Sequence, residues 1–333
     1  YFIKRSIITN NLFGVDIMEE AIEIAKLRLF LALVASANSA DDLEPLPNIE
    51  FNIMAGNSLI GALHVDPSKF DAMAGVAGEQ KRLTFRYEVR EGDLAFAVES
   101  KMAKSRREKE AEYIAQVQGR RFTELLAEKD ELIALYRRAT GYGDELQELR
   151  DSIEKRKTTA KTTLNRLLLG QFQALDIRYE QATWDEKKGR EGKPERRPLK
   201  EADIEALEPF HWGYEFDQIV GGRGGFDAII TNPPWEIFKP NAKEFFEEYS
   251  ALVSKKKMSI KEFEKEEAKR LDDRDIREAW LKYQSEYPHV SAFYRSAPQY
   301  KNQISIVDGR KAGTDINLYK LFLEQCHNLL REG

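Results

Sequence analysis

The chain has very little sulfur or imidazole: one cysteine, Cys326, and four histidines among 333 residues. A single thiol excludes a disulfide within the chain, as is usual for proteins of a reducing compartment. The histidines and the cysteine lack the spacing of a metal site. No apolar run is long enough to span a bilayer, and the first five residues do not open a signal peptide. We therefore expect a cytoplasmic protein without a metal centre or membrane contact.

The chain also lacks an excess of positive charge, since its formal net charge is −5. This charge argues against strong binding to DNA by these residues alone. A hydrophobic content of 42% supports a true core, whereas 33% charged residues indicate a large exposed and mainly helical fraction. The length permits two or three units.

One stretch, residues 226–235, combines features of a strand and of a ligand site. Apolar and β-favouring residues run into Asn232-Pro233-Pro234, which predicts a short buried strand that ends at a turn. In open α/β sheets, ligands collect outside the carboxyl ends of strands. The prolines remove two amide donors, Asn232 adds a polar side chain, and Trp235 offers a flat surface. This pattern favours a planar substrate with an exocyclic amino group, such as adenine, over an ordinary Pro-Pro turn with a packing tryptophan.

A second candidate site follows residues 12–17, which read as a short buried strand ending near Asp16. The next segment, from Glu19 to about Ala37, predicts a helix that is apolar nearly all round and therefore largely buried. An acidic residue at a strand end before such a helix can accept hydrogen bonds from ribose hydroxyls. A helix N-cap is the alternative for Asp16.

A third candidate site follows residues 49–54, which alternate with period two and predict another strand. It ends at Ala55-Gly56-Asn57-Ser58. Gly56 permits an unusual backbone angle, and the Asn57 amide can both donate and accept hydrogen bonds. These properties suit contact with the edge of an adenine ring.

Together these stretches resemble the amino-group DNA methyltransferases that use S-adenosylmethionine, whose signature is Asn/Asp-Pro-Pro followed by an aromatic residue. More narrowly, the chain resembles the large, type IIG-like adenine-specific methylases of bacterial restriction-modification and phage defence. The resemblance covers roughly residues 1–64, 209–240 and 312–333. It implies an α/β fold: a partial Rossmann-like methyltransferase core with large helical insertions. It also implies double-stranded DNA as substrate, with restriction or specificity domains or subunits of the same system as further partners.

The resemblance assigns roles to particular residues. The catalytic residues would be Asn232, Pro233, Pro234 and Trp235. They would hold the N6 amino group of an adenine flipped out of the duplex. The cofactor-binding residues would be two pairs, Asp16 with Ile17 and Asn57 with Ser58. Asp16 would bind the ribose, and the loop at Asn57 would contact the cofactor's adenine. Asn57 departs from the aspartate that is common at this position of the family.

The spacing of the motifs predicts five segments. Asn57 and Asn232 are 175 positions apart, too far for a single crossover between neighbouring strands. Apolar residues at helical spacing predict two long antiparallel helices joined at 140–144, and residues 185–198 read as a mobile linker. The helical hairpin could clamp DNA, dock a partner or act as a spacer, and a solvated charged surface is the favoured interpretation. The predicted segments are a first part of the core (1–64), a helical insertion with a charged linker (65–208), a core strand with the catalytic turn (209–240), a second helical insertion (241–312) and a core helix (313–333).

The first cofactor motif of the family, a Gly-rich turn between a strand and a helix, is missing ahead of Asp16. We therefore expect a fragment of a longer protein that by itself binds S-adenosylmethionine weakly and is inactive. Two other functions stay open. The chain could belong to a methyltransferase acting on a protein glutamine, whose amide presents the same NH2 group. It could also be an interaction module in which the helical hairpin is active and the methylase core is not.

Overall fold

A computed structural model of the protein describes residues 1–37, 39, 47–83, 121–139, 144–250, 253, 258–303, 306–307, 310–311 and 315–332. The chain forms two compact units. The first unit comprises residues 1–168, 201–225 and 331–333, and the second comprises 169–200 and 226–330. Within the described ranges, no helix has both the length and the apolar character needed to cross a membrane.

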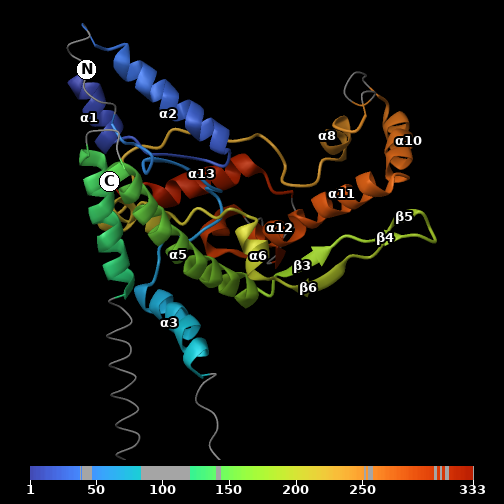
Figure 1. Ribbon diagram of the computed structural model, residues 1–333. Helices are drawn as coiled ribbons and strands as arrows, with labels where there is room; N and C mark the ends of the chain where they lie inside the picture. The colour runs from blue at the N-terminus through green and yellow to red at the C-terminus, as the bar shows by residue number, and fades with distance from the viewer. Residues whose placement is uncertain are drawn as a thin grey trace, which may run out of the picture. The chain divides into compact units, whose positions relative to one another are not determined.

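The first unit is mainly helical (Figure 1). Its described residues contain a single pair of strands. Its elements are α1 (Phe2–Asn10), β1 (Gly14–Asp16), α2 (Glu19–Val34), β2 (Ile53–Ala55), α3 (Pro67–Leu83), a helix over 121–138, α5 (Asp144–Ala174, which continues into the second unit), α6 (Glu201–Glu205), α7 (Trp212–Glu215) and the π-helix η2 (Gln218–Gly222).

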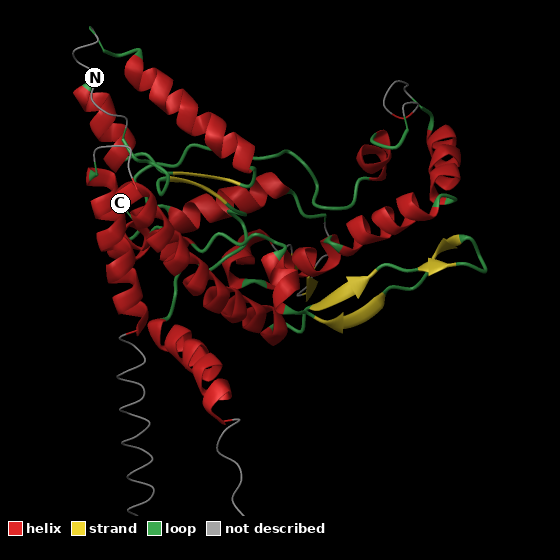
Figure 2. Ribbon diagram, viewed as in Figure 1, coloured by secondary structure: helices red, strands yellow, loops and turns green. Residues whose placement is uncertain are grey.

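The second unit combines two-stranded ribbons with short helices (Figure 2). Its elements are β3 (Arg178–Gln181), β4 (Trp184–Asp185), β5 (Arg190–Glu191), β6 (Glu195–Pro198), α8 (Ala242–Glu247), α10 (Ile260–Leu271), α11 (Arg274–Ser285), α12 (Tyr287–Ser296), the 3-10 helix η3 (Pro298–Gln303), β7 (Ile306–Val307), β8 (Arg310–Lys311) and α13 (Leu318–Leu329).

The strands β1 and β2 are parallel, with Gly14 opposite Ile53 and Asp16 opposite Ala55. Both predicted strands are therefore present, although shorter than predicted. The buried side chain of Asn52 supports them, because its Nδ2 donates to the Thr9 carbonyl at 2.9 Å. The parallel pairing places the carboxyl ends of the two strands next to each other, as a shared ligand site requires.

The helix α2 buries only one of its two apolar sides. Ile22 and Leu33 pack in a cluster with Ile8, Ile49 and Ile53. The opposite side leaves four apolar residues between 42% and 58% exposed: Ile24, Leu27, Leu31 and Val34. The prediction of a largely buried helix is therefore wrong. A pair of three-residue strands offers too little surface to cover a helix from more than one side.

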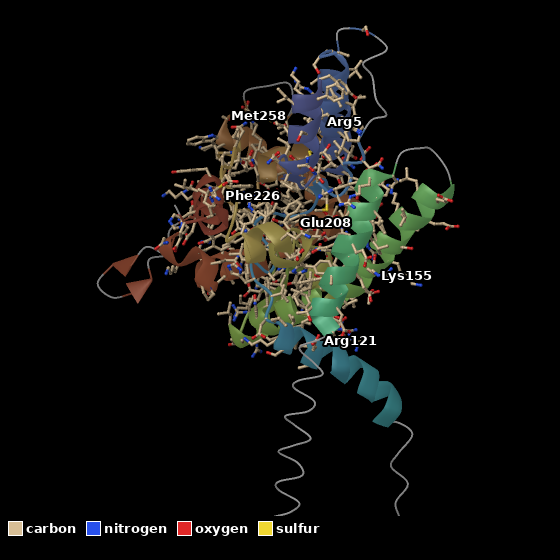
Figure 3. The ribbon with its side chains drawn as sticks, turned by 90° about the vertical axis from the view of Figure 1, so that its left-hand side faces the viewer. Arg5, Arg121, Lys155, Glu208, Phe226 and Met258 are labelled. Atoms are coloured by element: carbon tan, nitrogen blue, oxygen red, sulfur yellow. The ribbon has the colours of Figure 1, made fainter. Side chains whose placement is uncertain are left out.

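The two antiparallel helices of the predicted hairpin are confirmed, whereas residues 140–143 of the predicted joint lie outside the described residues. Tyr136, late in the first helix, packs with Ile153, which lies early in α5. Phe122, at the start of the first helix, packs with Ala160 and Leu164 further along α5. This order of contacts makes the two helices antiparallel. The outer side of α5 is charged and solvated, as shown by the exposed Lys155 (Figure 3).

Buried ionic contacts join the hairpin to the segment around α7. The Lys129 ammonium, 1% exposed, donates to the Asp217 carboxylate and to the Tyr214 carbonyl. Lys157 of α5 pairs with Glu215 at 3.2 Å. Each helix of the hairpin therefore contributes one lysine that holds a carboxylate at or just beyond the end of α7.

The first part of the predicted core segment 209–240, residues 209–216, forms no strand in the structure. Pro209 makes a single bridge with Asn57, and the chain then turns into the short helix α7. Aromatic packing explains the difference, since Trp212 lies in edge contact with Phe210 and also contacts Phe216. The aromatic residues Trp212, Tyr214 and Phe216 alternate in the sequence, but they belong to an irregular packed segment and form no β-ladder.

The mobile linker predicted over 185–198 is wrong, because these residues form the outer part of an antiparallel ribbon (Figure 2). The Asp185 carboxylate accepts the amides of Lys187 and Lys188 at 3.1 and 3.2 Å, and Gly189 takes a left-handed φ of 56°. Such an Asp-to-Gly turn sets the ribbon register locally. The Glu191 carboxylate then accepts the Trp280 indole N–H at 2.9 Å, which anchors the tip to α11.

Candidate active site

The first candidate site lies at the adjacent carboxyl ends of β1 and β2. The Gly56 amide donates to the Asp16 carbonyl at 2.8 Å, which continues the pairing one step past the strands. The Asp16 side chain accepts the Met18 amide at 2.9 Å through Oδ1 and thereby fixes the entry to α2. Asp16 is exposed, and so is Ile17 at 55%. The carboxylate thus has a local structural role and keeps acceptor capacity toward solvent.

Asn57 is held by backbone hydrogen bonds on both sides. Its amide donates to the carbonyl of Glu208 at 2.8 Å, and its carbonyl accepts the Phe210 amide at 3.2 Å. Its side-chain oxygen accepts the Leu59 amide at 3.1 Å. Within the described ranges its Nδ2 group has no hydrogen-bond partner. Asn57 therefore offers donors, which suit the ring nitrogens of an adenine.

The loop after Asn57 is fixed by the segment around α7. The Trp212 indole N–H donates to the Ser58 carbonyl at 3.0 Å, and the Ala62 amide donates to His211 Nδ1 at 3.2 Å. At Gly61 the φ is +145°, and a Cβ atom would lie 2.1 Å from the Phe210 carbonyl oxygen. Only glycine fits there. The loop bearing Asn57 and Ser58 therefore has little freedom to move away from residues 208–213.

His211 is the centre of this support. It is 3% exposed, and burial lowers the pKa of its imidazole to about 3. The ring is neutral at pH 7, accepts the Ala62 amide at Nδ1 and donates from Nε2 to Asn165 Oδ1 at 2.9 Å. His211 thus links the loop to α5. Sequence reasoning missed it, because a lone histidine carries no spacing signal.

The depressed pKa of His211 predicts a loss of stability in mild acid. Between the unfolded value of 6.5 and the folded value of about 3, the unfolded chain binds a proton that the folded chain does not. The contribution of His211 to the free energy of unfolding is therefore fully present above about pH 6.5. It falls on acidification, by about 2 kcal/mol between pH 7 and pH 5. Urea unfolding at both pH values measures this loss.

The matched variants for this measurement are His211→Gln and, at an exposed histidine, His64→Gln. Between pH 7 and pH 5, the fall in the free energy of unfolding should be about 2 kcal/mol smaller in His211→Gln than in the wild type. His64→Gln should leave the difference as it is in the wild type. An equal pH dependence in all three proteins would refute the assignment of a neutral, buried His211.

The second candidate site, the stretch 226–235, lies in the second unit. The Phe226 amide donates to the Leu329 carbonyl at 2.8 Å, and Phe226 bridges Leu330. The following residues form no strand, and Ile230 is 99% exposed. The predicted buried strand is therefore wrong. A central strand needs ladder partners along its length, and the described residues provide this stretch with one bridge at its first residue.

The other end of the stretch is also tied to α13. The Leu318 amide donates to the Glu236 carbonyl at 3.0 Å, and the Phe238 amide donates to the Ile316 carbonyl at 2.8 Å. Ile237 and Asn317 form an antiparallel bridge between these bonds. Within the described part of the predicted helical segment 313–333, α13 begins at Leu318, because Ile316 and Asn317 are used in this pairing.

Between Phe226 and Glu236, the stretch has exposed polar and aromatic side chains. Asn232 is exposed, and neither its side chain nor the Pro233 carbonyl has a hydrogen-bond partner in the part of the chain that the structure describes. Trp235 is 79% exposed and stacks on Tyr319 with ring centroids 4.8 Å apart and planes inclined by 23°. The stretch therefore offers acceptors and a flat surface together. Sequence reasoning did not single out Tyr319.

The predicted site residues thus form two groups. The cofactor group, Asp16 and Ile17 with Asn57 and Ser58, gathers at one pair of strand ends in the first unit. The catalytic group, 232–235, lies in the second unit, and its convergence with the first group stays a prediction. Among the described residues, no group of three or more His, Cys, Asp or Glu side chains could hold a metal ion.

Comparison with known proteins identifies the family. The sequence profile of the Eco57I restriction-modification methylases matches residues 10–273, which include both groups of site residues. The chain belongs to this family. The resemblance inferred from the sequence to restriction-modification methylases is thereby confirmed.

One relative of the Eco57I methylase chain comes from Methanocaldococcus jannaschii and is named as a predicted type II restriction enzyme and methyltransferase. The two proteins are 32% identical over 254 residues, which cover 72% of this chain and 19% of the relative. The chain thus spans about a fifth of the length of that relative. No solved structure matches the chain.

Proposed function

We propose that this chain carries cofactor-binding and catalytic residues of an adenine-N6 DNA methyltransferase of a restriction-modification system. The observation that supports this most is the stretch 226–236, which is tied to both ends of α13 and is open in between. Its free acceptors at Asn232 and Pro233 and its exposed Trp235 are the groups that an exocyclic amino group on a planar ring requires. Membership of the Eco57I methylase family supports the same function.

The residues at the strand ends fit S-adenosylmethionine, which supplies an electrophilic methyl group when bound. The Asp16 carboxylate can accept hydrogen bonds from ribose hydroxyls. The Asn57 Nδ2 group can donate to a ring nitrogen of the cofactor's adenine. Ile17, exposed beside them, offers an apolar surface to the ring. The fit therefore rests on acceptor, donor and apolar groups that the fold places at neighbouring positions.

The chemical role of Asn232 and Pro233 follows from the electronic structure of adenine. The N6 lone pair is conjugated with the ring and is a weak nucleophile. The Asn232 side-chain oxygen and the Pro233 carbonyl would each accept one N6 hydrogen, which turns the lone pair out of the ring system. The same two acceptors stabilise the positive charge that develops on N6, and fixed acceptors need no reorganisation during the reaction.

The adenine must leave the duplex to reach these acceptors, because base pairing hides N6. Trp235 would receive the displaced ring on its open side. Other parts of the protein would supply restriction or specificity functions and much of the affinity for DNA, since this chain carries a net charge of −5. Double-stranded DNA is thus the proposed substrate.

Radiolabel transfer tests the proposal. The full-length protein is incubated with methyl-labelled S-adenosylmethionine, unmethylated duplex DNA and, separately, a protein extract. We expect the label on the N6 amino group of adenine in the DNA. Label on protein glutamine would support the rival methyltransferase instead. Absence of label from both substrates would overturn the proposal.

A further inference from the structure

We propose that Tyr319 is the positioning residue for the base-binding surface of Trp235, so that a displaced adenine completes a three-ring stack in the order Tyr319, Trp235, adenine. The inference rests on the proposed function, because it assigns the ring that the stack receives. Tyr319 would not touch the substrate. It would hold the indole in the orientation that the substrate needs.

The backbone pairing brings the chain next to Trp235 close to the first turn of α13. The antiparallel bridge joins Ile237 to Asn317. Two residues back from Ile237 lies Trp235, and two residues forward from Asn317 lies Tyr319. Trp235 precedes the bridge, whereas Tyr319 lies in the first turn of α13, which follows the N-cap residue Asn317. The bridge and its two flanking hydrogen bonds thus hold the chain next to the first turn of α13, where the two rings stack.

The contact covers one side of the indole and leaves the other open. The ring centroids are 4.8 Å apart and the planes are inclined by 23°, a nearly parallel arrangement. Tyr319 is half-buried at the start of α13, whereas Trp235 remains 79% exposed. An indole that is free on both sides would rotate about its side-chain bonds. Packing against Tyr319 limits this rotation and lowers the entropy cost of stacking a base on the open side.

The surroundings of the stack suit a nucleotide. The Lys320 ammonium lies 6.0 Å from the centre of the Tyr319 ring and is exposed, so positive charge is available beside the aromatic pair. The open acceptors of Asn232 and Pro233 precede Trp235 by three and two residues. A planar base with an amino group, attached to a phosphate backbone, matches this combination of surfaces.

Tryptophan fluorescence of the full-length protein tests the stack directly. The probe is single-stranded oligo(dA), with an abasic oligomer of equal length as the ligand control, and the signal of Trp235 is isolated by subtracting a Trp235→Phe variant. Wild-type Trp235 should be quenched by oligo(dA) and not by the abasic oligomer. Tyr319→Leu should weaken the oligo(dA) affinity roughly tenfold, within the range known for loss of base stacking. Tyr319→Phe should restore it.

The matched control is Leu323→Ala, one turn further along α13, where the side chain is 70% exposed. It should bind oligo(dA) as the wild type does. Steady-state kinetics on unmethylated DNA provide a second measurement. Tyr319→Leu should lower kcat/KM for DNA roughly tenfold and leave the KM for S-adenosylmethionine unchanged. A loss that Tyr319→Phe does not restore would overturn the inference, because the phenol oxygen is not part of the stack.

The outcomes separate this inference from the proposed function. Base-dependent quenching that requires Tyr319, in a protein that transfers no methyl group to DNA, would support the stack and overturn the methyltransferase. Normal methyl transfer and normal quenching in Tyr319→Leu, with an unchanged midpoint of thermal unfolding, would overturn the stack and leave the methyltransferase intact.

Discussion

Replacing Asn232 by alanine should lower kcat for methyl transfer to DNA by at least about 10²- to 10³-fold, the usual effect of losing one fixed polar group that stabilises a transition state. The side chain is exposed and has no hydrogen-bond partner among the described residues, so its removal breaks no contact of the folded chain. Binding of S-adenosylmethionine should be unchanged. Methyl transfer and cofactor calorimetry, both on the full-length protein, measure the two quantities.

Two further variants define the origin of this effect. Asn232→Asp keeps a side-chain acceptor at the same position and should retain more activity than the alanine variant. Glu236→Gln should be as active as the wild type. Its side chain is exposed, and only its backbone carbonyl is used, in the hydrogen bond from Leu318. Activity of Asn232→Ala within a few fold of the wild type would remove Asn232 from the mechanism.

Replacing Lys129 by methionine should destabilise the fold by about 3–5 kcal/mol at pH 7, because it leaves a carboxylate without its buried partner. Lys129 is 1% exposed, and its ammonium also lies 4.8 Å from the centre of the Tyr214 ring and 3.3 Å from Asp130. Burial raises the pKa of the Asp217 carboxyl, and the charge of Lys129 opposes that rise. Urea unfolding at pH 7 measures the loss.

The pH dependence and a double variant test the cause of this loss. Without Lys129 the folded-state pKa of Asp217 should rise further above its unfolded value, so the variant should recover stability as the pH falls and the carboxyl becomes protonated. Lys129→Met with Asp217→Leu should recover part of the loss, because it also removes the more buried of the two carboxylates that contact Lys129. Lys155→Met, at an exposed lysine of α5, should change stability little. A comparable loss in Lys155→Met would contradict the assignment.

The helical hairpin was predictable because local information determines it. Apolar residues at helical spacing define the inner side of each helix, and the antiparallel order follows from the short connection between them. The same holds for the adjacency of Asp16 and Asn57. Two short strands separated by a helix pair in parallel, and parallel strands bring their carboxyl ends to one edge.

Other features could not be read from the sequence because they depend on partners distant along the chain. The stretch 226–231 has the composition of a buried strand, yet a strand forms only where other strands supply hydrogen bonds. The helix α2 has two apolar sides, and only the packing decides which one is buried. In 185–198 the charged composition indicated a linker, and the turn at Asp185 and Gly189 outweighed it.

Some residues of the candidate sites could likewise be predicted from the sequence, and others could not. Motif and strand-end arguments singled out Asn232, Trp235, Asp16 and Asn57. Tyr319 and His211 could not be found by such arguments, because each acts through a contact made across more than 80 residues: Trp235 to Tyr319, and Ala62 to His211. Supporting residues of this kind become visible only when the backbone pairing is known.

The ties at both ends of α13 also determine how far the Asn-Pro-Pro-Trp stretch stands away from the helix. The helix holds its anchor points about 17 Å apart at 1.5 Å per residue. The ten residues that join Phe226 to Glu236 can reach about 33 Å when extended. The stretch is therefore longer than the span between its anchor points, and Asn232, past its middle, is exposed. The surplus length allows the chain to hold its acceptors away from the helix surface, and deleting one residue between Asp227 and Thr231 would shorten this reach while leaving the contact of Trp235 with Tyr319 in place.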